Sequence, residues 1–297
     1  MKVFITGGTG FVGTAVIKHL IAHGHDVLAL ARSDRSAQRV RDLGATPFAG
    51  SLTDTDRLRL GALQSNAVLH LAYNNNMRQA RQAAQTDRNA ITAMADALVG
   101  TNRPFIMASG VTGIFGKHQS GNELETPATN FITGMRVRSE KLALSYVPRG
   151  VKAMVIRLAP FVHGPNDHGF TSRYVQAAQR YQSAMYIGSG RNTWPAVHRD
   201  DAASLFVAAL EKGQAGAIYH AVAEGTTAKS IAITVSQHLD LPLTRINMLT
   251  GLHRLGILAY IFTLDTPANS TWTQQHLGWH PTHPSLINDI NAGTYDN

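Results

Sequence analysis

The stretch Thr6–Gly13, TGGTGFVG, decides the fold of this chain. It follows a short apolar strand, Lys2–Ile5, and opens a helix expected over Phe11–His23, where apolar residues recur at helical spacing. In such a turn, one glycine permits the tight bend, another lets the backbone approach a pyrophosphate, and a third lets the helix pack against the strand. The helix N-terminus then presents N–H groups and a positive dipole to phosphates. The stretch therefore predicts a dinucleotide-binding site.

The first 160 residues continue this alternation of strand and helix. Further strands are expected at Asp26–Ala31, Thr46–Leu52, Ala67–Ala72, Phe105–Ser109 and Val151–Leu158. Helices are expected at Ser36–Leu43, at Arg57–Leu63 with Asp54 as N-cap, at Arg78–Val99 and at Ile132–Tyr146. Continuous apolar strands between helices indicate a parallel sheet covered on both faces. The predicted fold class is α/β, a Rossmann-type doubly wound parallel sheet with a smaller C-terminal substrate-binding lobe.

The domain boundaries follow from where this alternation weakens. Residues 1–165 are expected to form the dinucleotide-binding domain, and residues 197–223 to return to it with a helix at Ala202–Glu211 and a strand at Ile218–Val222. Residues 166–196 and 224–297, which Gly, Pro and His interrupt, are expected to form the substrate-binding lobe.

Composition excludes several classes of protein. The chain has 297 residues, 44% of them apolar and 15% charged, which is typical of a folded globular protein. It has no cysteine, which excludes disulfides, zinc–thiolate sites, Cys-ligated iron–sulfur clusters and a cysteine nucleophile. Its 14 histidines show no metal-binding spacing, so no metal is predicted.

Charge and hydropathy bear on location and partners. No apolar run approaches the roughly 18 residues of a membrane span, and no signal peptide is visible, so we expect a cytoplasmic protein without a membrane partner. The net charge is +8, but the basic residues are dispersed. Dispersed charge disfavours nucleic acid as a partner and favours attraction of a phosphorylated small molecule.

The end of the second expected strand bears on which dinucleotide binds. NAD sites usually place a carboxylate there for the ribose 2′-OH, whereas this chain has Ala31 and Arg32. Arg32 and Arg35 can hold a 2′-phosphate and Ser33 can donate to it, which favours NADP. Arg32 can instead stack on adenine, and Asp34 can reach the ribose, so NAD stays open as the alternative.

Further motifs occur at the ends of later strands. These are His70–Ala72 (HLA), Ser109, Arg157–Pro165 (RLAPFVHGP), Trp194–Ala202 (WPAVHRDDA) and Leu277–Pro281 (LGWHP). Together with Thr6–Gly13 they resemble the extended short-chain dehydrogenase/reductase family, which includes epimerases, dehydratases and dihydroflavonol-type reductases. The resemblance covers nearly the whole chain. It implies a nicotinamide cofactor and chemistry on a small carbonyl or alcohol substrate.

The resemblance also implies roles for individual residues. Ser109 would orient the substrate oxygen, Leu71 and Ala72 would lie beside the cofactor, and Pro160 would contact its nicotinamide end. The full set expected to bind cofactor is Gly7, Gly8, Thr9, Gly10, Phe11, Val12, Gly13, Arg32, Ser33, Arg35, Leu71, Ala72, Arg136 and Pro160. Family members often pair through two long helices, so a homodimer is expected.

The chain departs from the family at its Tyr-x-x-x-Lys pair. There, the lysine holds the ribose and lowers the pKa of the phenol, which passes a proton. No tyrosine in this chain has Lys or Arg four residues later. Aligned on Ser139 and Glu140, Ile132 takes the tyrosine position and Arg136 the lysine position. Arg136 can still bind a ribose hydroxyl, but the usual proton donor is missing.

Other residues at the same sheet edge are candidates for catalysis or substrate binding. Tyr73 follows the fourth strand, and His163 and His168 follow the sixth. For each we favour packing on the cofactor or lining a polar pocket, with proton donation by Tyr73 or His163 as the alternative. Trp194 and His198 are expected near the substrate, although Asp200 beside them can equally be a helix N-cap.

These observations favour an NADP-dependent oxidoreductase, or a related epimerase or dehydratase, acting on a small organic substrate. The alternative is a catalytically silent dinucleotide-binding regulator or scaffold, because the usual tyrosine is absent. Binding of RNA by the basic surface is a weaker hypothesis.

Overall fold

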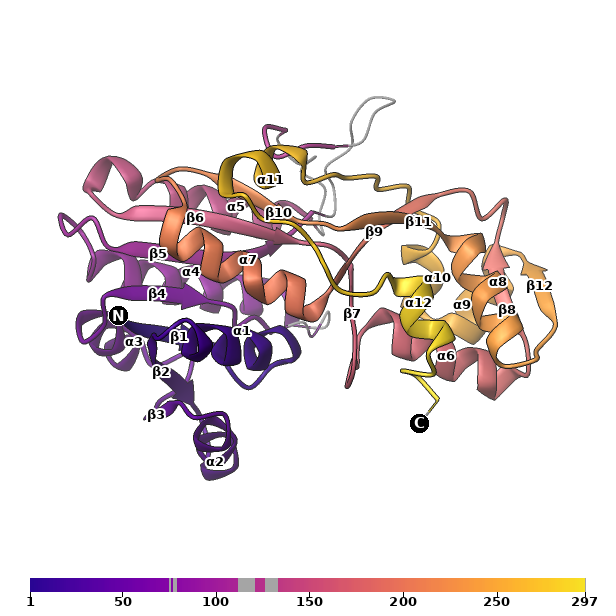
Figure 1. The fold of residues 1–297 in the computed structure, drawn as a ribbon, viewed down its shortest axis with the longest axis horizontal. Helices are drawn as coiled ribbons and strands as arrows, with labels where there is room; N and C mark the ends of the chain where they lie inside the picture. The colour runs from indigo at the N-terminus through magenta and orange to yellow at the C-terminus, as the bar shows by residue number, and fades with distance from the viewer. Residues whose placement is uncertain (75, 77–78, 112–120, 126–132, 297) are drawn as a thin grey trace.

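The structure is a computed structural model, and it describes residues 1–74, 76, 79–111, 121–125 and 133–296. A seven-stranded parallel sheet forms one half of the molecule, in the order β10-β6-β5-β4-β1-β2-β3 (Figure 1). Its strands are β1 (Lys2–Thr6), β2 (Asp26–Ala31), β3 (Thr46–Ala49), β4 (Ala67–His70), β5 (Pro104–Gly110), β6 (Lys152–Leu158) and β10 (Ile218–Ala221). The predicted Rossmann-type fold is confirmed. The strand order reverses between β1 and β4, where ligands bind in such sheets.

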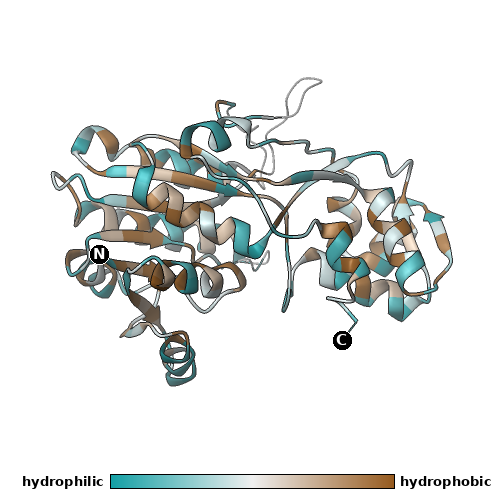
Figure 2. Cartoon of the chain, in the orientation of Figure 1, coloured by the Kyte–Doolittle hydropathy of each residue, from teal (hydrophilic) through white to brown (hydrophobic). Residues whose placement is uncertain are grey.

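Helices cover both faces of the sheet. The helices α1 (Phe11–Ala22), α2 (Asp34–Asp42) and α7 (Arg199–Lys212) pack on one face, and α3 (Thr55–Leu63), α4 (Ala80–Asp96) and α5 (Thr133–Leu144) on the other. A short 3₁₀ turn, Val147–Arg149, precedes β6. Each face of the sheet has its own hydrophobic core. Successive residues of β1 pack into these two cores in turn, with Val3 and Ile5 facing α1 and Phe4 facing α3. Most strands of this sheet are accordingly hydrophobic along their length (Figure 2).

Several element boundaries match their sequence patterns, with differences at the ends. Asp54 caps α3 as predicted, because its side chain accepts the Arg57 N–H at 3.1 Å. The N-cap of α7 is His198 and not Asp200, which lies in the first turn of that helix. Arg78 and Ile132, the expected first residues of two helices, lie outside the described residues.

The C-terminal lobe has its own sheets and core. Its strands are β7 (Phe161–His163), β8 (Ala184–Ile187), β9 (Thr193–His198), β11 (Glu224–Thr227) and β12 (Leu243–Ile246), arranged as β11-β9-β7 and β12-β8. Its helices are α6 (Phe170–Tyr181), α8 (Ala228–His238), α9 (Met248–Leu255), α10 (Ile257–Ile261) and α12 (Leu286–Asn291). The C-terminus lies on this lobe and the N-terminus on the large sheet (Figure 1).

Two features differ from the expected lobe. Helix α11 (Thr271–Leu277) packs against α7 and β10, and Trp279 joins the same core, so this stretch belongs with the large sheet. Trp194 is 1% exposed and packs edge-on against Phe161, with ring centroids 5.7 Å apart. The expectation that Trp194 binds substrate is corrected, because its ring is part of the lobe core. No helix in the described ranges is long and apolar enough to cross a membrane.

Candidate functional site

The loop between β1 and α1 has the close packing that its glycines predict. Gly7 has a φ of +77°, and a Cβ there would lie 2.6 Å from the backbone nitrogen of Ala72. A Cβ on Gly13 would collide with the carbonyl of Gly7. At Gly10, by contrast, a Cβ would meet only that same carbonyl oxygen, at 3.2 Å. Gly7 and Gly13 therefore let the helix pack closely against the sheet, and Gly10 leaves open space above the turn.

The N-terminus of α1 is suited to an anion. Gly10 is the N-cap, so no side chain caps the helix, and its first turn contains no acidic residue. The first N–H groups and the positive end of the helix dipole are not countered by a carboxylate on the same helix. The loop and helix therefore fit the pyrophosphate of a dinucleotide.

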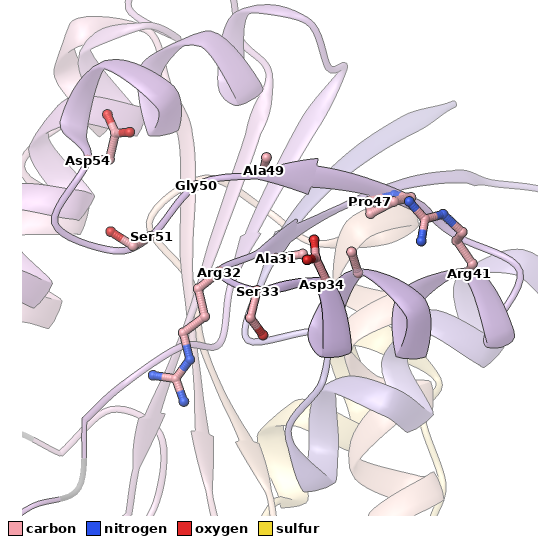
Figure 3. A pocket seen from close by; sticks show the side chains of 11 residues that line it. Ala31, Arg32, Ser33, Asp34, Arg41, Pro47, Ala49, Gly50, Ser51 and Asp54 are labelled. Carbon is pink, nitrogen blue, oxygen red and sulfur yellow. The ribbon is translucent and has the colours of Figure 1, made fainter.

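An open pocket of about 540 Å³ lies beside the ends of β2 and β3 (Figure 3). Its lining is Ala31, Arg32, Ser33, Asp34, Ala37, Arg41, Pro47, Ala49, Gly50, Ser51 and Asp54. Arg32 and Arg41 lie on either side of Asp34 in the view of Figure 3. Arg35 is exposed on the first turn of α2 but does not line the pocket. Sequence reasoning missed Arg41, although its spacing of four from Ala37 places both on one helix face.

Ser33 has a structural task as well as a place in this pocket. Its Oγ accepts the backbone N–H of Ser36 at 3.3 Å, and the Ser36 hydroxyl accepts the backbone N–H of Ser33 at 3.0 Å. The two serines therefore form a capping box at the start of α2. The Ser33 hydroxyl also donates to the Ser36 hydroxyl at 3.2 Å, and this bond competes with donation to a 2′-phosphate.

A buried chain of polar contacts lies under the ends of β1, β4 and β5. His70 Nδ1 lies 2.7 Å from the Thr6 hydroxyl, and His70 Nε2 lies 3.1 Å from Asp87 Oδ1. The other oxygen, Asp87 Oδ2, accepts Arg136 Nη1 at 2.9 Å. Arg136 Nη2 also donates to the carbonyl of Ala108. Asp87 thereby fixes the position of Arg136, the residue expected in the lysine position.

The charge on Asp87 is stabilised by these partners. Burial by itself would raise the pKa of the carboxyl, but the His70 hydrogen bond and the Arg136 charge outweigh it and lower the pKa to about 2. Asp87 is therefore ionised at neutral pH. An ionised, buried carboxylate holds a guanidinium more firmly than a neutral amide would.

Tyr73 and Ser109 lie at the same edge of the sheet. The Arg136 guanidinium carbon is 4.2 Å from the centroid of the Tyr73 ring. Burial raises the pKa of Tyr73, and the Arg136 charge only partly opposes this, so the phenol keeps its proton at neutral pH. Ser109 is 7% exposed, and its Oγ has no hydrogen-bond partner within the described part of the chain. Next to this edge, Ala72 donates its N–H to the Thr6 hydroxyl at 3.3 Å.

The remaining cofactor candidates surround this edge. Leu71 and Pro160, directly after β4 and close after β6, are both half-buried. Thr9, Phe11 and Val12 complete the loop with Gly8, and a Cβ on Gly8 would contact the Ile17 side chain at 2.8 Å. The guanidinium carbon of Arg199 lies over the Phe11 ring, 5.3 Å from the ring centroid.

Two of the three predicted site histidines, His163 and His198, are buried. His163 is 1% exposed, and its Nδ1 lies 2.6 Å from Asp289 Oδ2, so β7 is joined to α12 through this pair. His198 Nδ1 accepts the backbone N–H of Asp200 at 3.2 Å, and burial lowers the pKa of His198. His168 is exposed on the loop after β7. The contact with Asp289 gives His163 a structural role in joining these two elements.

One group of potential metal ligands occurs in the described ranges. Donor atoms of His198, Asp200 and His283 lie within 4.8 Å of one another. The two rings are stacked, 4.7 Å apart and 3° from parallel. Imidazole lone pairs lie in the ring plane, so parallel rings in separate planes do not point at one ion. Arg199 also pairs with Asp200 at 3.3 Å, and we assign no metal to this group.

Asp87 is a second site residue that sequence reasoning missed. It lies on the buried stripe of α4, between Ala84 and Ala90, with Ile91 on the same side. A carboxylate within an apolar stripe at spacings of three and four must find a partner inside the protein. The interruption of the apolar stripe by Asp87 is visible in the sequence, and it indicates a buried carboxylate with a partner inside the protein.

The comparisons with known proteins agree with this geometry. A profile described as the NAD dependent epimerase/dehydratase family matches residues 3–223. An uncharacterized protein of Schizosaccharomyces pombe is 38% identical, over 99% of this chain and 100% of its own length. A ketoreductase of Stigmatella aurantiaca is 25% identical, over 74% of this chain and 67% of its own.

A solved structure shows the same fold. The UDP-glucose 4-epimerase of Thermotoga maritima, determined with UDP-glucose, has a TM-score of 0.77 and 21% identity, and covers 100% of this chain and 98% of its own. The glycine loop, the strand order and the family match lead to one conclusion. The chain belongs to the NAD dependent epimerase/dehydratase family, within the extended short-chain dehydrogenases/reductases.

Proposed function

We propose that this protein reduces a small ketone or aldehyde, or oxidises the corresponding alcohol, with NADP as cofactor. The observation that carries the proposal is the buried Ser109 hydroxyl, which has no partner among the described residues and lies next to the carbonyl that positions Arg136. A buried hydroxyl without a partner is costly, and a substrate oxygen would satisfy it. The ketoreductase of Stigmatella aurantiaca, a relative of this chain, supports the same class of reaction.

In this proposal, separate residues bind the cofactor and the substrate. The loop at Thr6–Gly13 and the N-terminus of α1 hold the pyrophosphate, and the nicotinamide, when bound, supplies the hydride. Ser109 orients the substrate oxygen. Arg136 uses one nitrogen for Asp87 and another for Ala108, and its remaining N–H groups can bind the ribose.

Tyr73 is the proton donor in this proposal. It lies against Arg136, so it belongs to the same cluster as the ribose-binding cation. Its raised pKa keeps the phenol protonated, as an acid in the reductive direction must be. The weak acidity that goes with a raised pKa predicts slower proton transfer than a tyrosine paired with lysine achieves.

The preference for NADP rests on charge near the ribose of the adenosine. Arg32 and Arg41 line the pocket beside β2, and Arg35 is exposed on the adjoining helix. Asp34 and Asp54 in the same pocket oppose a 2′-phosphate, so the preference depends on the arginines outweighing two carboxylates.

Fluorescence titration with NADPH and NADH tests the cofactor part. NADPH should bind at least about tenfold more tightly, and Arg32→Glu should reduce that ratio by about tenfold or more because it reverses a charge. Arg103→Glu is the matched control, since Arg103 contacts the carbonyl of Ser65 at the opposite end of the sheet. Equal affinities for both nucleotides would refute the NADP preference.

A panel of carbonyl compounds with NADPH tests the catalytic part. Ser109→Ala and Tyr73→Phe should each lower kcat/KM by about a hundredfold while NADPH affinity changes little. If no compound is reduced and NADPH still binds, the alternative function applies.

The alternative is a dinucleotide-responsive regulator without catalysis. The ion pair between Arg136 and Asp87 favours it, because the residue in the lysine position is already engaged inside the protein. A partner whose affinity changes with NADPH would support this alternative. The homodimer and the cytoplasmic location stay predictions, and size-exclusion chromatography with light scattering would test the first.

A further inference from the structure

The helix α7 begins at a histidine that can cap it only while its ring is neutral. His198 Nδ1 accepts the backbone N–H of Asp200 at 3.2 Å, so this contact requires a ring nitrogen without a proton. An imidazolium carries an N–H on both nitrogens and has no lone pair with which to accept. Its positive charge would also face the positive end of the α7 dipole. Protonation of His198 therefore removes the cap and adds a repulsion at the same place.

The His198 ring is enclosed, so it cannot turn into water when it gains a charge. The residue is 5% exposed. The backbone of Gly164 lies against the ring, because a Cβ there would be 2.8 Å from His198 Nε2. The His283 ring stacks on the His198 ring with centroids 4.7 Å apart, and the His163 ring meets it edge-on at 5.5 Å. The elements around the ring must therefore move to accommodate its protonation.

Two carboxylates lie close enough to attract a proton to this ring. Asp289 Oδ2, on α12, is 4.0 Å from His198 Nε2, and Asp200 Oδ2, on α7, is 3.6 Å from His198 Nδ1. Asp200 has other cationic neighbours, since Arg199 Nη2 is 3.3 Å from one of its oxygens and His19 Nε2, on α1, is 3.7 Å from the other. Only part of the Asp200 charge is therefore left to stabilise a charged His198 ring.

The balance of these effects favours the neutral ring. Burial is the largest of them and lowers the pKa of His198. The His163 and His283 rings act in the same direction, Asp289 and Asp200 oppose them, and the net shift of the pKa is downward. A histidine with a lowered pKa adds stability above its ordinary value of 6.5, and that stability is lost as the pH falls below this value. Mild acidification is therefore the condition that stresses the cap.

The first turn of α7 holds together parts of both halves of the molecule. Asp201 accepts two backbone N–H groups of the segment before α12. Arg199 donates to the carbonyl of Pro165, on the loop after β7, at 2.9 Å. The Arg199 guanidinium also lies over the ring of Phe11 in the glycine loop. A change at the start of α7 therefore acts on the lobe and on the cofactor loop together.

We propose that His198 is a pH-sensitive cap of α7, whose protonation loosens the junction between the lobe and the large sheet. At neutral pH the ring holds the first turn of α7 and, through it, the segment before α12 and the loop after β7. At acid pH the imidazolium releases the Asp200 N–H, and these contacts open. The release also weakens cofactor binding through Arg199 and Phe11, a step that rests on the proposed function.

Urea unfolding at about pH 7.5 and about pH 5.5 tests the junction with a cap that does not titrate. His198→Asn keeps a side-chain acceptor at the N-cap. Between the two pH values, the unfolding midpoint of the wild type should fall by about 0.3 M more than that of the variant, the effect of one lost cap. His253→Asn is the matched control, because His253 is exposed on α9 and its removal should leave the wild-type pH dependence. Parallel pH dependence in the wild type and His198→Asn overturns the proposal.

Nuclear magnetic resonance of the wild type keeps the test decisive if the variant does not fold. The ring signals of His198 and the amide signal of Asp200 should titrate together, because one proton governs both. An Asp200 amide that stays unchanged while the ring titrates overturns the proposal. A ring that gains no proton above about pH 5 overturns it as well.

The link to the cofactor loop is measured separately. Between the same pH values, the Kd for NADPH should rise about threefold more in the wild type than in His198→Asn. The comparison of two proteins removes the titration of the nucleotide itself. An equal rise in both proteins overturns the link to the cofactor loop. If neither protein binds NADPH at either pH, the proposed function fails, and the urea comparison still decides whether His198 controls the junction.

Discussion

Asp87 is 2% exposed, and its two oxygens hold two different partners, His70 and Arg136. Its pKa of about 2 in the folded protein lies below the ordinary value of 3.8. A lowered pKa adds stability above the ordinary pKa, and that stability is lost as the pH falls toward the folded value. The window of loss therefore runs from about pH 4 down to about pH 2.

The first prediction concerns this window. Between pH about 4 and about 2, the wild type should lose about 2 kcal/mol of unfolding free energy more than Asp87→Asn, which has no carboxylate to titrate there. At neutral pH the same variant should be about 2 kcal/mol less stable, because Arg136 loses its ionised partner. Urea unfolding at each pH measures both quantities. Parallel pH profiles for the two proteins would show that Asp87 does not carry this dependence.

Substitution by alanine should affect stability at one glycine of the loop and NADPH binding at another. Gly13→Ala places a methyl group against the carbonyl of Gly7 and should cost about 3 kcal/mol of unfolding free energy, the upper end for overpacking. Gly10→Ala has more room and should cost less than about 1 kcal/mol. Its methyl group lies where a pyrophosphate approaches, so NADPH affinity should fall by about tenfold or more. Urea unfolding and fluorescence titration of both variants measure this, and equal stability losses would contradict it.

At the scale of elements, α2 begins with a capping box that shares a residue with the cofactor pocket. Ser33→Ala should cost about 1 kcal/mol, because the first turn of α2 loses an acceptor. Ser51→Ala is the control: Ser51 lines the same pocket but bonds only the Thr53 hydroxyl, at 2.9 Å, so its stability change should stay within about 0.5 kcal/mol. Urea unfolding compares the two. If Ser33→Ala is as stable as Ser51→Ala, the cap contributes nothing measurable.

The elements that sequence predicts well are those with a strong local signal. Asp26–Ala31 is a strand over the predicted residues, and α1 ends just before Gly24, which has a φ of +76°. Asp54 was identified as a cap because the capping interaction is local. His198 was missed as the cap of α7, since an imidazole acceptor is rare at that position and two aspartates follow it.

The candidate site also combines a local feature, which the sequence predicts, with long-range contacts, which it does not. The glycine loop is a local pattern, and the sequence predicts its geometry. The contacts of Asp87 with His70, of Arg136 with Ala108 and of His163 with Asp289 join residues far apart in the chain. Such pairs depend on which elements pack together, and one sequence does not specify that. Trp194 shows the same limit, because a motif position next to a site can be a core position of the lobe.

At the scale of the whole molecule, buried aspartates connect the last part of the chain to the rest. Asp289 on α12 holds His163 on β7, and Asp201 on α7 holds the segment before α12. Asp201 is 1% exposed and accepts the backbone N–H groups of Thr282 and His283, at 2.9 and 3.1 Å, and the His283 ring at 2.7 Å. These bonds join the lobe to a helix of the large sheet, so the two halves should unfold together.

The last prediction tests that coupling with two neighbouring residues. Asp201→Ala should lower the unfolding free energy by about 3 kcal/mol, because two backbone N–H groups and a ring N–H lose their acceptor together. Asp200→Ala should cost less than about 1 kcal/mol, since the Asp200 side chain is 24% exposed and its ion pairs are screened by water. In Asp201→Ala, brief proteolysis should cut near Thr282 before the rest of the chain, whereas Asp200→Ala should be cut like the wild type. If both variants have the same unfolding midpoint and the same cleavage pattern, Asp201 does not couple the halves. The lobe is then held to the sheet by its apolar contacts.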